Sequence, residues 1–534
     1  MKLKDLSDIE KKASAASRLD FSRLGVALLF MLAVFIYATT QSDTLLNGAA
    51  YAPALLVVAA LFGAYMAMNI GANDVANNMG PVVGSKALTM AGAIALAAIF
   101  EVLGAVIAGG EVVDTVKSGI IDLDVVGGAE TFVRVMACAL LAGAIWLNLA
   151  TAIGAPVSTT HSIVGAIMGA GIAAGGFGAV QWETMGAIVS SWVVSPVLGG
   201  IIAAIALYTI KRTITYRREM TKAAAQVVPL LNALMAWSFG GYMLIKGFGR
   251  LIALDFASAA LYAGIFAIVV YFLSRYVAKK AAQKNENSKA AVNKLFGLPL
   301  VFAAALLSFA HGANDVANAI GPLAAIDETL RNAAIASKTA IPLWVMLIGA
   351  LGLALGLALY GPRLIKTVGG EITDLDKTRA YCIALSAALT VIAASRLGLP
   401  VSTTHVAIGA VFGVGFLREY LKSSHAKMLE LIVAAHEGED RGRMEAYIAR
   451  FKSAALEKKA IMLKAMKKKA AQKEANHPHF SKKERKVLKK EYKRELVKRS
   501  AVKKIVAAWI ITVPATALLS ALLFAIAAAF FNAF

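Results

Sequence analysis

The stretch GANDVANN, residues 71–78, places an aspartate and three asparagines inside a strongly apolar part of the sequence. The segment PALLVVAALFGAYMAMNI precedes it, and ALTMAGAIALAAIF follows shortly afterwards. An aspartate in the hydrocarbon core of a membrane costs several kcal/mol, so it normally faces a cavity or a partner. Nearly the same stretch, GANDVANA, returns at 312–319. The recurrence indicates a buried polar site that the chain builds twice.

Composition and apolar runs indicate an α-helical protein that crosses a membrane many times. Of the 534 residues, 58% are hydrophobic and 16% are charged, whereas a soluble domain carries about a quarter charged residues. Runs of about 20 apolar residues, the length of a membrane-spanning helix, recur along the chain. The first follows a basic stretch and is expected to be a retained helix, because a cleaved signal peptide has a shorter apolar core. We expect membrane helices at about 24–40, 54–79, 88–108, 131–152, 157–177, 182–208, 227–247, 250–273, 297–320, 340–360, 378–397, 400–416 and 505–530.

Further landmarks repeat in the same order in both halves of the chain, which indicates a duplicated unit. The matched pairs are GANDVANN at 71 with GANDVANA at 312, IIDLD at 120–124 with ITDLD at 372–376, GAPVSTTH at 154–161 with GLPVSTTH at 398–405, and SWVVSP at 191–196 with AWIITVP at 508–514.

The distribution of basic residues predicts that the two copies are inserted in opposite directions. Lysine and arginine accumulate in cytoplasmic loops, and the basic stretches at 211–222, 275–294 and 417–504 all fall in the cytoplasm if the N-terminus does. The loop at 109–130 is acidic, whereas its counterpart at 363–379 is basic. We therefore expect two inverted-topology repeats with discontinuous or hairpin helices, the architecture of a secondary transporter of the cytoplasmic (inner) membrane with a site near the midplane.

These observations divide the chain into six parts. They are a basic segment with an extra transmembrane helix at 1–50, the first transport repeat at 51–208, a linker with two transmembrane helices at 209–296, the main part of the second repeat at 297–416, a basic cytoplasmic insert at 417–504, and the last helix of the second repeat at 505–534.

The insert at 417–504 carries much of the net charge of +22, since about half of all lysines and arginines lie between Arg418 and Lys504. It is rich in alanine, lysine and glutamate, which favour helix. Charge alone would permit nucleic-acid binding. The expectation is instead a solvated helical domain near anionic lipid head groups, with no nucleic-acid partner.

The duplicated GANDVAN motif has the chemistry of a cation site. Carboxylate and amide oxygens are hard ligands that suit Na⁺. Gly71 and Gly312 would let the backbone open and offer carbonyl oxygens as further ligands. The structural alternative is hydrogen bonding between helices, but two acidic copies in opposed repeats weigh against it. The candidate ligands of the coupling cation are Asp74, Asp315, Asn77 and Asn318, with Na⁺ expected at the two aspartates.

The duplicated Pro-Val-Ser-Thr-Thr-His motif has the chemistry of an anion site. Pro156 and Pro400 suit the start of a helix, where unpaired N–H groups and the helix dipole attract anions. Two such starts that face each other suit a tetrahedral oxyanion such as phosphate or sulfate. The alternative is ordinary N-capping by serine or threonine. The candidate anion ligands are Ser158, Thr159, Thr160, Ser402, Thr403 and Thr404.

Four further ionisable residues lie in or next to apolar segments. His161 and His405 follow the threonines and are expected to be buried donors, with a role toward the anion or protons as the alternative. His311 stands where the first copy has Ile70, and Glu101 stands where the second has Met346. For Glu101 a role in cation coupling and a local hydrogen bond are both open.

The residues GANDVANNMGPVVGSKALT, HGANDVANAIGPLAAI, GAPVSTTHSIVGA and GLPVSTTHVAIGA resemble the inorganic phosphate transporter (PiT) family, over about 50–208 and 297–530. The resemblance implies Na⁺- or H⁺-coupled uptake of inorganic phosphate through two inverted repeats. It implies that Asn73, Asp74, Asn314 and Asp315 are coupling-ion and substrate-site residues, and we assign the two asparagines to phosphate. Glu101 matches a family glutamate. The chain departs from the pattern at Met136 and Ala384, where many members carry glutamate.

The sequence thus predicts a phosphate symporter that works by alternating access. A sulfate permease of the same family is the alternative, and an anion channel or a membrane scaffold that acts through 417–504 are alternatives of another class. No nucleophile–base set, metal cluster or nucleotide loop occurs, so we expect no enzyme and no cofactor beyond the coupling ion. Cys138 and Cys382 are expected to be buried apolar fillers. A homo-oligomer is left open.

Overall fold

The computed structural model describes residues 3–43, 45, 52–122, 125–247, 254–332, 341–371, 375–434, 446, 449–450 and 499–532. All regular structure in these ranges is helical, apart from one isolated bridge between Ile121 and Val180. The prediction of an all-α fold is therefore confirmed. Most of the predicted insert at 417–504 lies outside the described residues, so its helical and cytoplasmic character stays a prediction.

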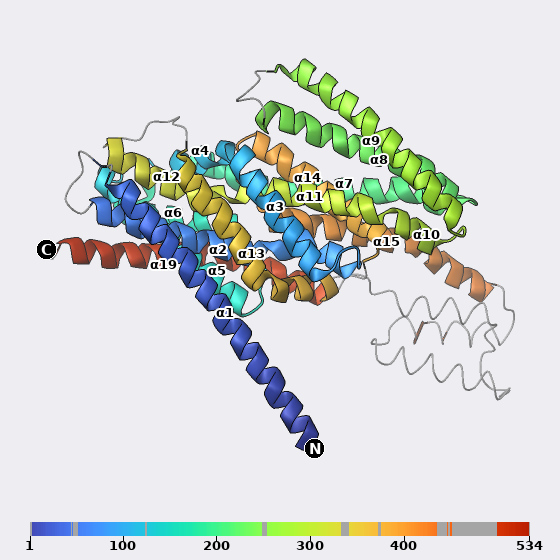
Figure 1. The fold of residues 1–534 in the computed structure, drawn as a ribbon, viewed down its shortest axis with the longest axis horizontal. Coiled ribbons are helices and arrows are strands. Elements are labelled where there is room, and N and C mark those ends of the chain that lie inside the picture. The colour runs from blue at the N-terminus through green and yellow to red at the C-terminus, as the bar shows by residue number, and fades with distance from the viewer. Residues whose placement is uncertain are drawn as a thin grey trace.

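The helices follow the apolar segments that the sequence predicts (Figure 1). The first part of the chain forms α1 (Leu3–Ser42), α2 (Ala52–Gly84), α3 (Met90–Ala108), α4 (Gly110–Ser118), α5 (Ala129–Ala152), α6 (Thr159–Gly175), the 3₁₀ turn η1 (Phe177–Ala179) and α7 (Trp182–Ile210). The linker forms the π-helical turn η2 (Lys211–Thr215), α8 (Met220–Tyr242), a second π turn η3 (Met243–Gly247), α9 (Phe256–Lys284) and α10 (Lys289–Leu295). The last part forms α11 (Gly297–Asp315), α12 (Ala317–Asn332), α13 (Leu343–Glu371), α14 (Lys377–Arg396), α15 (Thr403–Ala434) and α19 (Arg499–Asn532).

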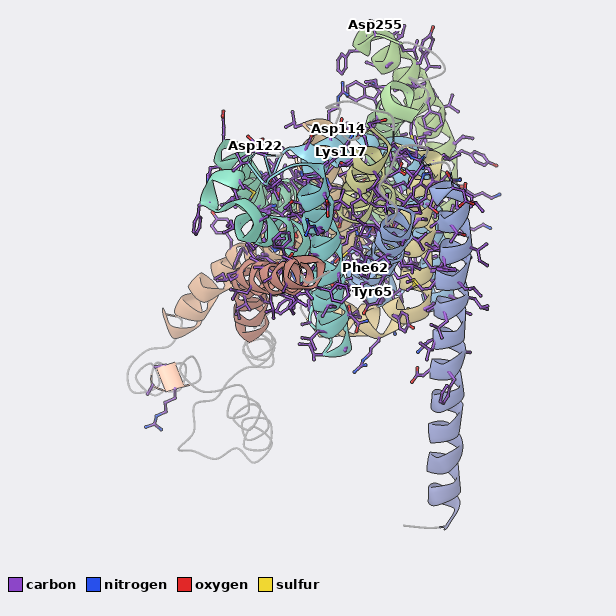
Figure 2. The ribbon with its side chains drawn as sticks, turned by 90° about the vertical axis from the view of Figure 1, so that its left-hand side faces the viewer. Phe62, Tyr65, Asp114, Lys117, Asp122 and Asp255 are labelled. Atoms are coloured by element: carbon purple, nitrogen blue, oxygen red, sulfur yellow. The ribbon has the colours of Figure 1, made fainter. Side chains whose placement is uncertain are left out.

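The described part of the chain is a multi-pass membrane protein. Among the described residues, 11 helical segments are long and apolar enough to cross a membrane. Large apolar side chains of the outer helices are exposed, for example Leu261, Phe272 and Tyr276 on α9, as expected of a surface that faces lipid. Figure 2 shows α1 extending well beyond the other helices, and Asp255 marks the far end of the α8–α9 pair.

Helix packing repeats between the two halves. Helix α2 packs on α13, and its counterpart α11 packs on α3; α5 lies against α2, and α14 lies against α11. The final helices cross over, since α7 packs on α15 of the second half and α19 packs on α6 of the first (Figure 1). The two halves therefore interlock, and neither half completes its packing without the other.

Each half contains a helical hairpin whose tip carries the Ser-Thr-Thr motif. Helices α5 and α6 pack together, as do α14 and α15. The first helix of each hairpin, α5 or α14, ends at a glycine with positive φ, +73° at Gly154 and +67° at Gly398. The N–H of Ala155 bonds to Ala150 O at 2.9 Å, and the N–H of Leu399 bonds to Ala394 O at 3.1 Å. These are Schellman endings, which stop a helix sharply at glycine.

A proline and a capping serine then start the returning helix of each hairpin. Proline at 156 and 400 cannot continue the preceding helix. Ser158 Oγ accepts from the His161 N–H at 3.1 Å, and Ser402 Oγ accepts from the His405 N–H at 3.2 Å. The serines therefore act as N-caps. The motif Gly-X-Pro-Val-Ser thus encodes the whole tip: the glycine ends the first helix, the next residues form an extended link, and the serine starts the second helix.

The expectation that Gly71 and Gly312 open the backbone is wrong. Helix α2 runs unbroken through Gly71, and the second copy breaks only at Val316, between α11 and α12. A methyl group at Gly71 would overlap Leu353 O on α13, and one at Gly312 would overlap Glu101 O on α3. Both glycines instead permit two helices to approach closely, a use typical of membrane helix pairs.

We expect Gly312→Ala to destabilise the protein by about 1–3 kcal/mol or more, because the added methyl forces α3 and α11 apart. Gly186→Ala on α7 is the matched control, since a methyl there meets nothing within 4 Å and removal of a helical glycine is favourable by up to about 1 kcal/mol. The measurement is the temperature at which the detergent-solubilised protein loses its monodisperse size-exclusion peak. Equal melting of the two variants would contradict the close-approach account.

Candidate functional site

Each hairpin tip contacts the aspartate of its own half. Thr159 Oγ1, in the first turn of α6, donates to Asp74 Oδ2 on α2 at 2.9 Å. Thr403 Oγ1, in the first turn of α15, donates to Asp315 Oδ2 at the end of α11 at 2.8 Å. All four side chains are buried. The two motifs that the sequence places about 85 residues apart in each half thus form one contact, made twice.

Threonines of both tips also reach the opposite half. Thr404 Oγ1 lies 3.1 Å from Asp74 Oδ1 and accepts from Asn77 Nδ2 at 2.8 Å. Thr159 Oγ1 lies 3.4 Å from Asp315 Oδ2. Asn318 Nδ2 donates to Thr160 Oγ1 at 3.2 Å. Each aspartate is therefore within reach of hydroxyls from both hairpin tips, and the two acids share one buried cluster.

The two tips are also hydrogen-bonded to each other. Thr160 Oγ1 donates to Val401 O at 3.0 Å, and Thr404 Oγ1 lies 3.5 Å from Val157 O. The contacts are reciprocal, because each threonine bonds the extended residue before the capping serine of the other tip. Relative movement of the hairpins must break these bonds.

Asn73 and Asn314 brace the tip loops. Asn73 Nδ2 donates to Thr151 Oγ1 at 3.1 Å and to Ala155 O at 3.2 Å. In the orientation that satisfies its amide, Asn314 accepts from Ser395 Oγ at 2.8 Å and donates to Val401 O at 2.9 Å. These bonds tie the helices of the GANDVAN motifs to the loops at the Schellman endings, so the asparagines position the tips.

His311 joins the two aspartates to a third carboxylate. Its Nε2 lies 3.1 Å from Asp315 Oδ2 and 3.7 Å from Asp74 Oδ2, and its Nδ1 lies 3.1 Å from Glu101 Oε1. Glu101, on α3, also accepts from Asn78 Nδ2 at 3.1 Å. All of these side chains are fully buried. The sequence pattern predicts Glu101 as a cation ligand. It marks His311 only as a break in the symmetry of the repeats, and it assigns no role to Asn78.

Four buried oxygen atoms in this cluster accept no hydrogen bond from any described residue. They are Asn77 Oδ1, Asn78 Oδ1, Glu101 Oε2 and Asn318 Oδ1. An unsatisfied buried acceptor costs roughly 1–3 kcal/mol, so four of them in one cluster call for a partner. Such oxygens are the ligands that a hard cation requires.

The oxygen and nitrogen atoms around the two aspartates can coordinate a cation. Ligand atoms of Asp74, His311 and Asp315 lie within 4.8 Å of one another. The surrounding amide oxygens are hard and neutral, so they add coordination without adding charge. The predicted cation ligands Asp74, Asp315, Asn77, Asn318 and Glu101 are thus brought together by the fold.

The predicted anion ligands divide into three groups, of which the first, Asn73 and Asn314, braces the tip loops. The threonines at 159, 403 and 404 face the aspartates, whereas Thr160 bonds Val401 O and Asn318. Ser158 and Ser402 direct their hydroxyls to the backbone of their own helices as caps, the alternative that the sequence also allowed.

The histidines after the threonines pack in an aromatic stack behind the tips. The His161 ring lies 3.8 Å from the Trp192 ring, and the His405 ring lies 3.7 Å from the Trp509 ring. The two histidines lie 4.3 Å apart, edge to face. Trp192 Nε1 donates to Pro400 O of the opposite tip at 3.1 Å. The ring contact between histidine and tryptophan is made in both halves, which explains why the tryptophan motifs repeat together with the Ser-Thr-Thr motifs.

The sequence profile of the phosphate transporter family matches residues 70–520, which include every motif of the cluster. The chain belongs to this family. The predicted resemblance to phosphate transporters is therefore confirmed.

The names of similar proteins agree with the assignment of this chain to the phosphate transporter family. Proteins titled "Putative phosphate permease" are 52% identical in Helicobacter pylori (strain ATCC 700392 / 26695), covering 98% of both chains, and 38% identical in Chlamydia trachomatis serovar D, covering 71% of this chain and 93% of the relative. A solved structure titled "The sodium-dependent phosphate transporter" has a TM-score of 0.71 and 30% identity, covering 89% of this chain and 98% of that chain. Family and fold are those of a transporter, which supports phosphate as the substrate.

Proposed function

We propose that the chain takes up inorganic phosphate together with Na⁺ by alternating access. The observation that carries the proposal is the shared cluster itself. Two buried aspartates from opposite halves meet hydroxyls from two helix starts, among oxygens that accept no hydrogen bond from the described residues.

The anion part of the proposal rests on the two hairpin tips. The first turns of α6 and α15 bring N–H groups, helix dipoles and threonine hydroxyls to one place from two directions. Helix starts attract oxyanions, and hydroxyl donors in a water-poor site select a tetrahedral ion with several acceptor oxygens. The hydroxyls of Thr159, Thr403 and Thr404 point to carboxylates in this structure. They would turn to phosphate when it binds.

The cation part follows from charge. Three carboxylates and one imidazole are fully buried in the cluster, and phosphate would add further negative charge. Such a site is strongly unfavourable unless cations enter with the anion. Sodium fits better than protons alone, because a proton on a carboxylate would not use the amide oxygens of Asn77, Asn78 and Asn318.

The repeated packing supports alternating access. Contacts between α2 and α13 recur between α11 and α3, and each final helix packs on the other half. With basic loops inside the cell, α2 and α11–α12 would run in opposite directions, and the two hairpins would enter the membrane from opposite sides. Rocking of the hairpins would expose the cluster to one side at a time. The N-terminus is then cytoplasmic, and the membrane is the inner one.

The test is uptake of labelled phosphate into proteoliposomes, with sodium and proton gradients imposed separately. We expect an inward sodium gradient to drive accumulation and excess sulfate to compete weakly. Uptake driven only by a proton gradient would reassign the coupling ion, and inhibition of phosphate uptake by equimolar sulfate would favour the sulfate permease. Equilibration of phosphate without accumulation under either gradient would mean a channel and would end the symporter proposal.

Glu101→Gln separates cation coupling from local hydrogen bonding. If the carboxylate contributes its charge to a cation, we expect the sodium concentration for half-maximal uptake to rise roughly tenfold, since a buried charge interacts strongly. If Glu101 only accepts from Asn78, glutamine keeps that acceptor. Glu130→Gln, which changes a half-exposed carboxylate paired with Arg134 on α5, is the control. An unchanged sodium dependence in Glu101→Gln would remove this residue from the coupling site.

A further inference from the structure

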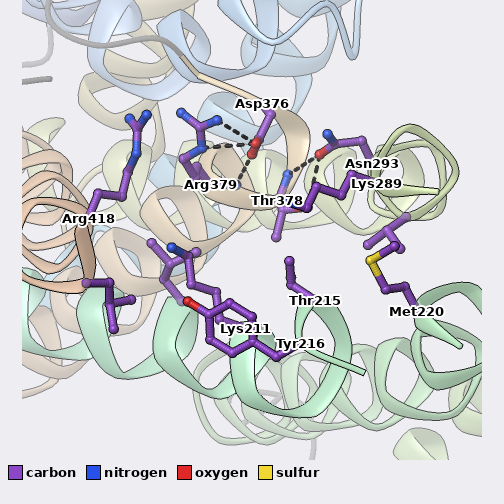
Figure 3. Close-up of a pocket in the computed structure, with 13 residues that line it drawn as sticks. Lys211, Thr215, Tyr216, Met220, Lys289, Asn293, Asp376, Thr378, Arg379 and Arg418 are labelled. Atoms are coloured by element: carbon purple, nitrogen blue, oxygen red, sulfur yellow. Dashed lines mark hydrogen bonds and ion pairs between the residues drawn. The ribbon is translucent and has the colours of Figure 1, made fainter. Parts of the chain in front are cut away.

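A second polar cavity lies away from the hairpin tips, at the opposite end of the second hairpin (Figure 3). It has a volume of about 470 Å³ and is lined by the end of α7 with η2, the start of α8, α10, the start of α14 and α15. None of its lining residues belongs to the buried aspartate cluster. Helix α14 has 20 residues, so it separates the cavity from the tip by roughly 30 Å.

The lining of the cavity is strongly cationic. Four basic residues line it from four elements, and a single acidic residue, Asp376, lines it with them; the basic residues are Lys211, Lys289, Arg379 and Arg418. Asp376 is engaged by its own helix, because Arg379 donates to its Oδ2 through Nε at 2.9 Å and Nη2 at 2.6 Å. Among the described lining residues, basic side chains thus outnumber acidic ones by four to one.

The cationic residues are held in a built site. Arg418 is buried, with 8% of its surface exposed. Thr378 donates through both its N–H and Oγ1 to Asn293 Oδ1, at 3.4 and 3.0 Å, which locks α10 to α14. Lys211 begins the π-helical turn η2, closed by a bond from Tyr216 N–H to Lys211 O at 2.9 Å. Turns of this kind occur often at functional sites.

The start of α14 adds to the positive potential. Asp376 is the N-cap of this helix, and Thr378 and Arg379 of its first turn face the cavity. A helix N-terminus contributes a partial positive charge, and lysine and arginine with hydroxyl and amide groups are the donors that recognise phosphate oxygens. Cavities of several hundred cubic ångströms hold small molecules or lipid head groups.

We propose that this cavity is a second anion site, which binds a phosphate-type oxyanion independently of the aspartate cluster. The occupant is either free phosphate or the head group of an anionic phospholipid. Both helices of the second hairpin line the cavity, so the occupant contacts the element that carries Thr403 and Thr404. The inference of an anion site rests on the cavity alone, whereas any effect on uptake also rests on the proposed transport function.

The test is equilibrium binding of labelled inorganic phosphate to the purified full chain in nanodiscs, at equal ionic strength with sodium chloride or choline chloride. Binding at the transport site is sodium-dependent under the proposal above, so the component in choline chloride reports the second cavity. The variants are Lys211→Gln/Lys289→Gln and the exposed single change Lys289→Gln, with Lys280→Gln on α9 as the matched loss of an exposed positive charge outside the lining.

In phosphatidylcholine nanodiscs we expect a sodium-independent site in the wild type and in Lys280→Gln, weakened roughly tenfold or more in the double variant. If phosphatidylglycerol abolishes that component in the wild type, the occupant is a lipid head group; if the component persists, it is free phosphate. Binding by the double variant that equals the wild type in both lipids would overturn the inference. Absence of a sodium-dependent component in the wild type would count against the transport proposal and leave the cavity site intact.

Discussion

Asp74→Asn is expected to reduce sodium-driven phosphate uptake at least about 100-fold while the protein stays folded. Asp74 meets hydroxyls from both hairpin tips, Thr159 at 2.9 Å and Thr404 at 3.1 Å. Asparagine keeps the shape of the side chain but removes the charge that a cation requires. An interaction worth several kcal/mol corresponds to a factor of 100 or more. Asp315→Asn is expected to behave in the same way, because its contacts to Thr403 and His311 mirror those of Asp74.

The measurement is initial uptake in proteoliposomes, with the amount of correctly folded protein checked by size-exclusion chromatography. Asp255→Asn is the control, since this residue caps α9 at the far end of the α8–α9 pair (Figure 2). Uptake by Asp74→Asn within a fewfold of the wild type would show that the buried acid has no part in transport.

Thr404→Val is expected to lower uptake by roughly 10- to 100-fold. Thr404 Oγ1 accepts from Asn77 at 2.8 Å and lies 3.1 Å from Asp74. Valine has nearly the same shape, so the variant removes one hydroxyl and leaves a buried amide donor unpaired, a loss of roughly 1–3 kcal/mol. Because the hydroxyl belongs to the second hairpin and its partners to the first half, the variant also weakens the contact that joins them.

The informative comparison is within the same hairpin. Thr390→Val on α14 removes a buried hydroxyl that donates only to Ser386 O of its own helix at 2.9 Å, and Thr404→Ser keeps the hydroxyl. We expect both to retain most uptake, and Thr404→Val to raise the KM for phosphate. If Thr404→Val and Thr390→Val were equally active, the tip hydroxyls would have no specific role.

Much of the cluster is predictable because buried polar groups need partners. Acidic and hydroxylic motifs that repeat in the same order, both inside apolar segments, are tolerated only where they meet each other or a ligand. The fold brings Asp74 to Thr159 and Asp315 to Thr403, as that reasoning requires.

The cross-contacts are not predictable from the sequence. Thr404 reaches Asp74 of the other half rather than the acid of its own half, and this depends on how far the two tips overlap. A shift of one residue also decides whether a hydroxyl caps a helix or faces the cluster. Ser402 caps α15, whereas the next residue, Thr403, donates to Asp315.

Long-range packing explains the remaining differences between the predicted and the observed site. The glycines at 71 and 312 allow an opened backbone in principle, but the carbonyls that they contact belong to α13 and α3, about 280 and 210 residues away in the chain. His311 was visible as a break in the symmetry of the repeats. Its place between Glu101 and Asp315 follows from α3 packing on α11, which no local pattern encodes.

The most direct test of the account is the sodium dependence of phosphate binding to the purified protein. If cations and phosphate occupy one cluster, each must raise the affinity for the other by the same factor. We expect phosphate affinity at the transport site to rise with sodium in the wild type, and this dependence to vanish in Asp74→Asn/Asp315→Asn. Wild-type phosphate binding that is indifferent to sodium and to pH would contradict the account.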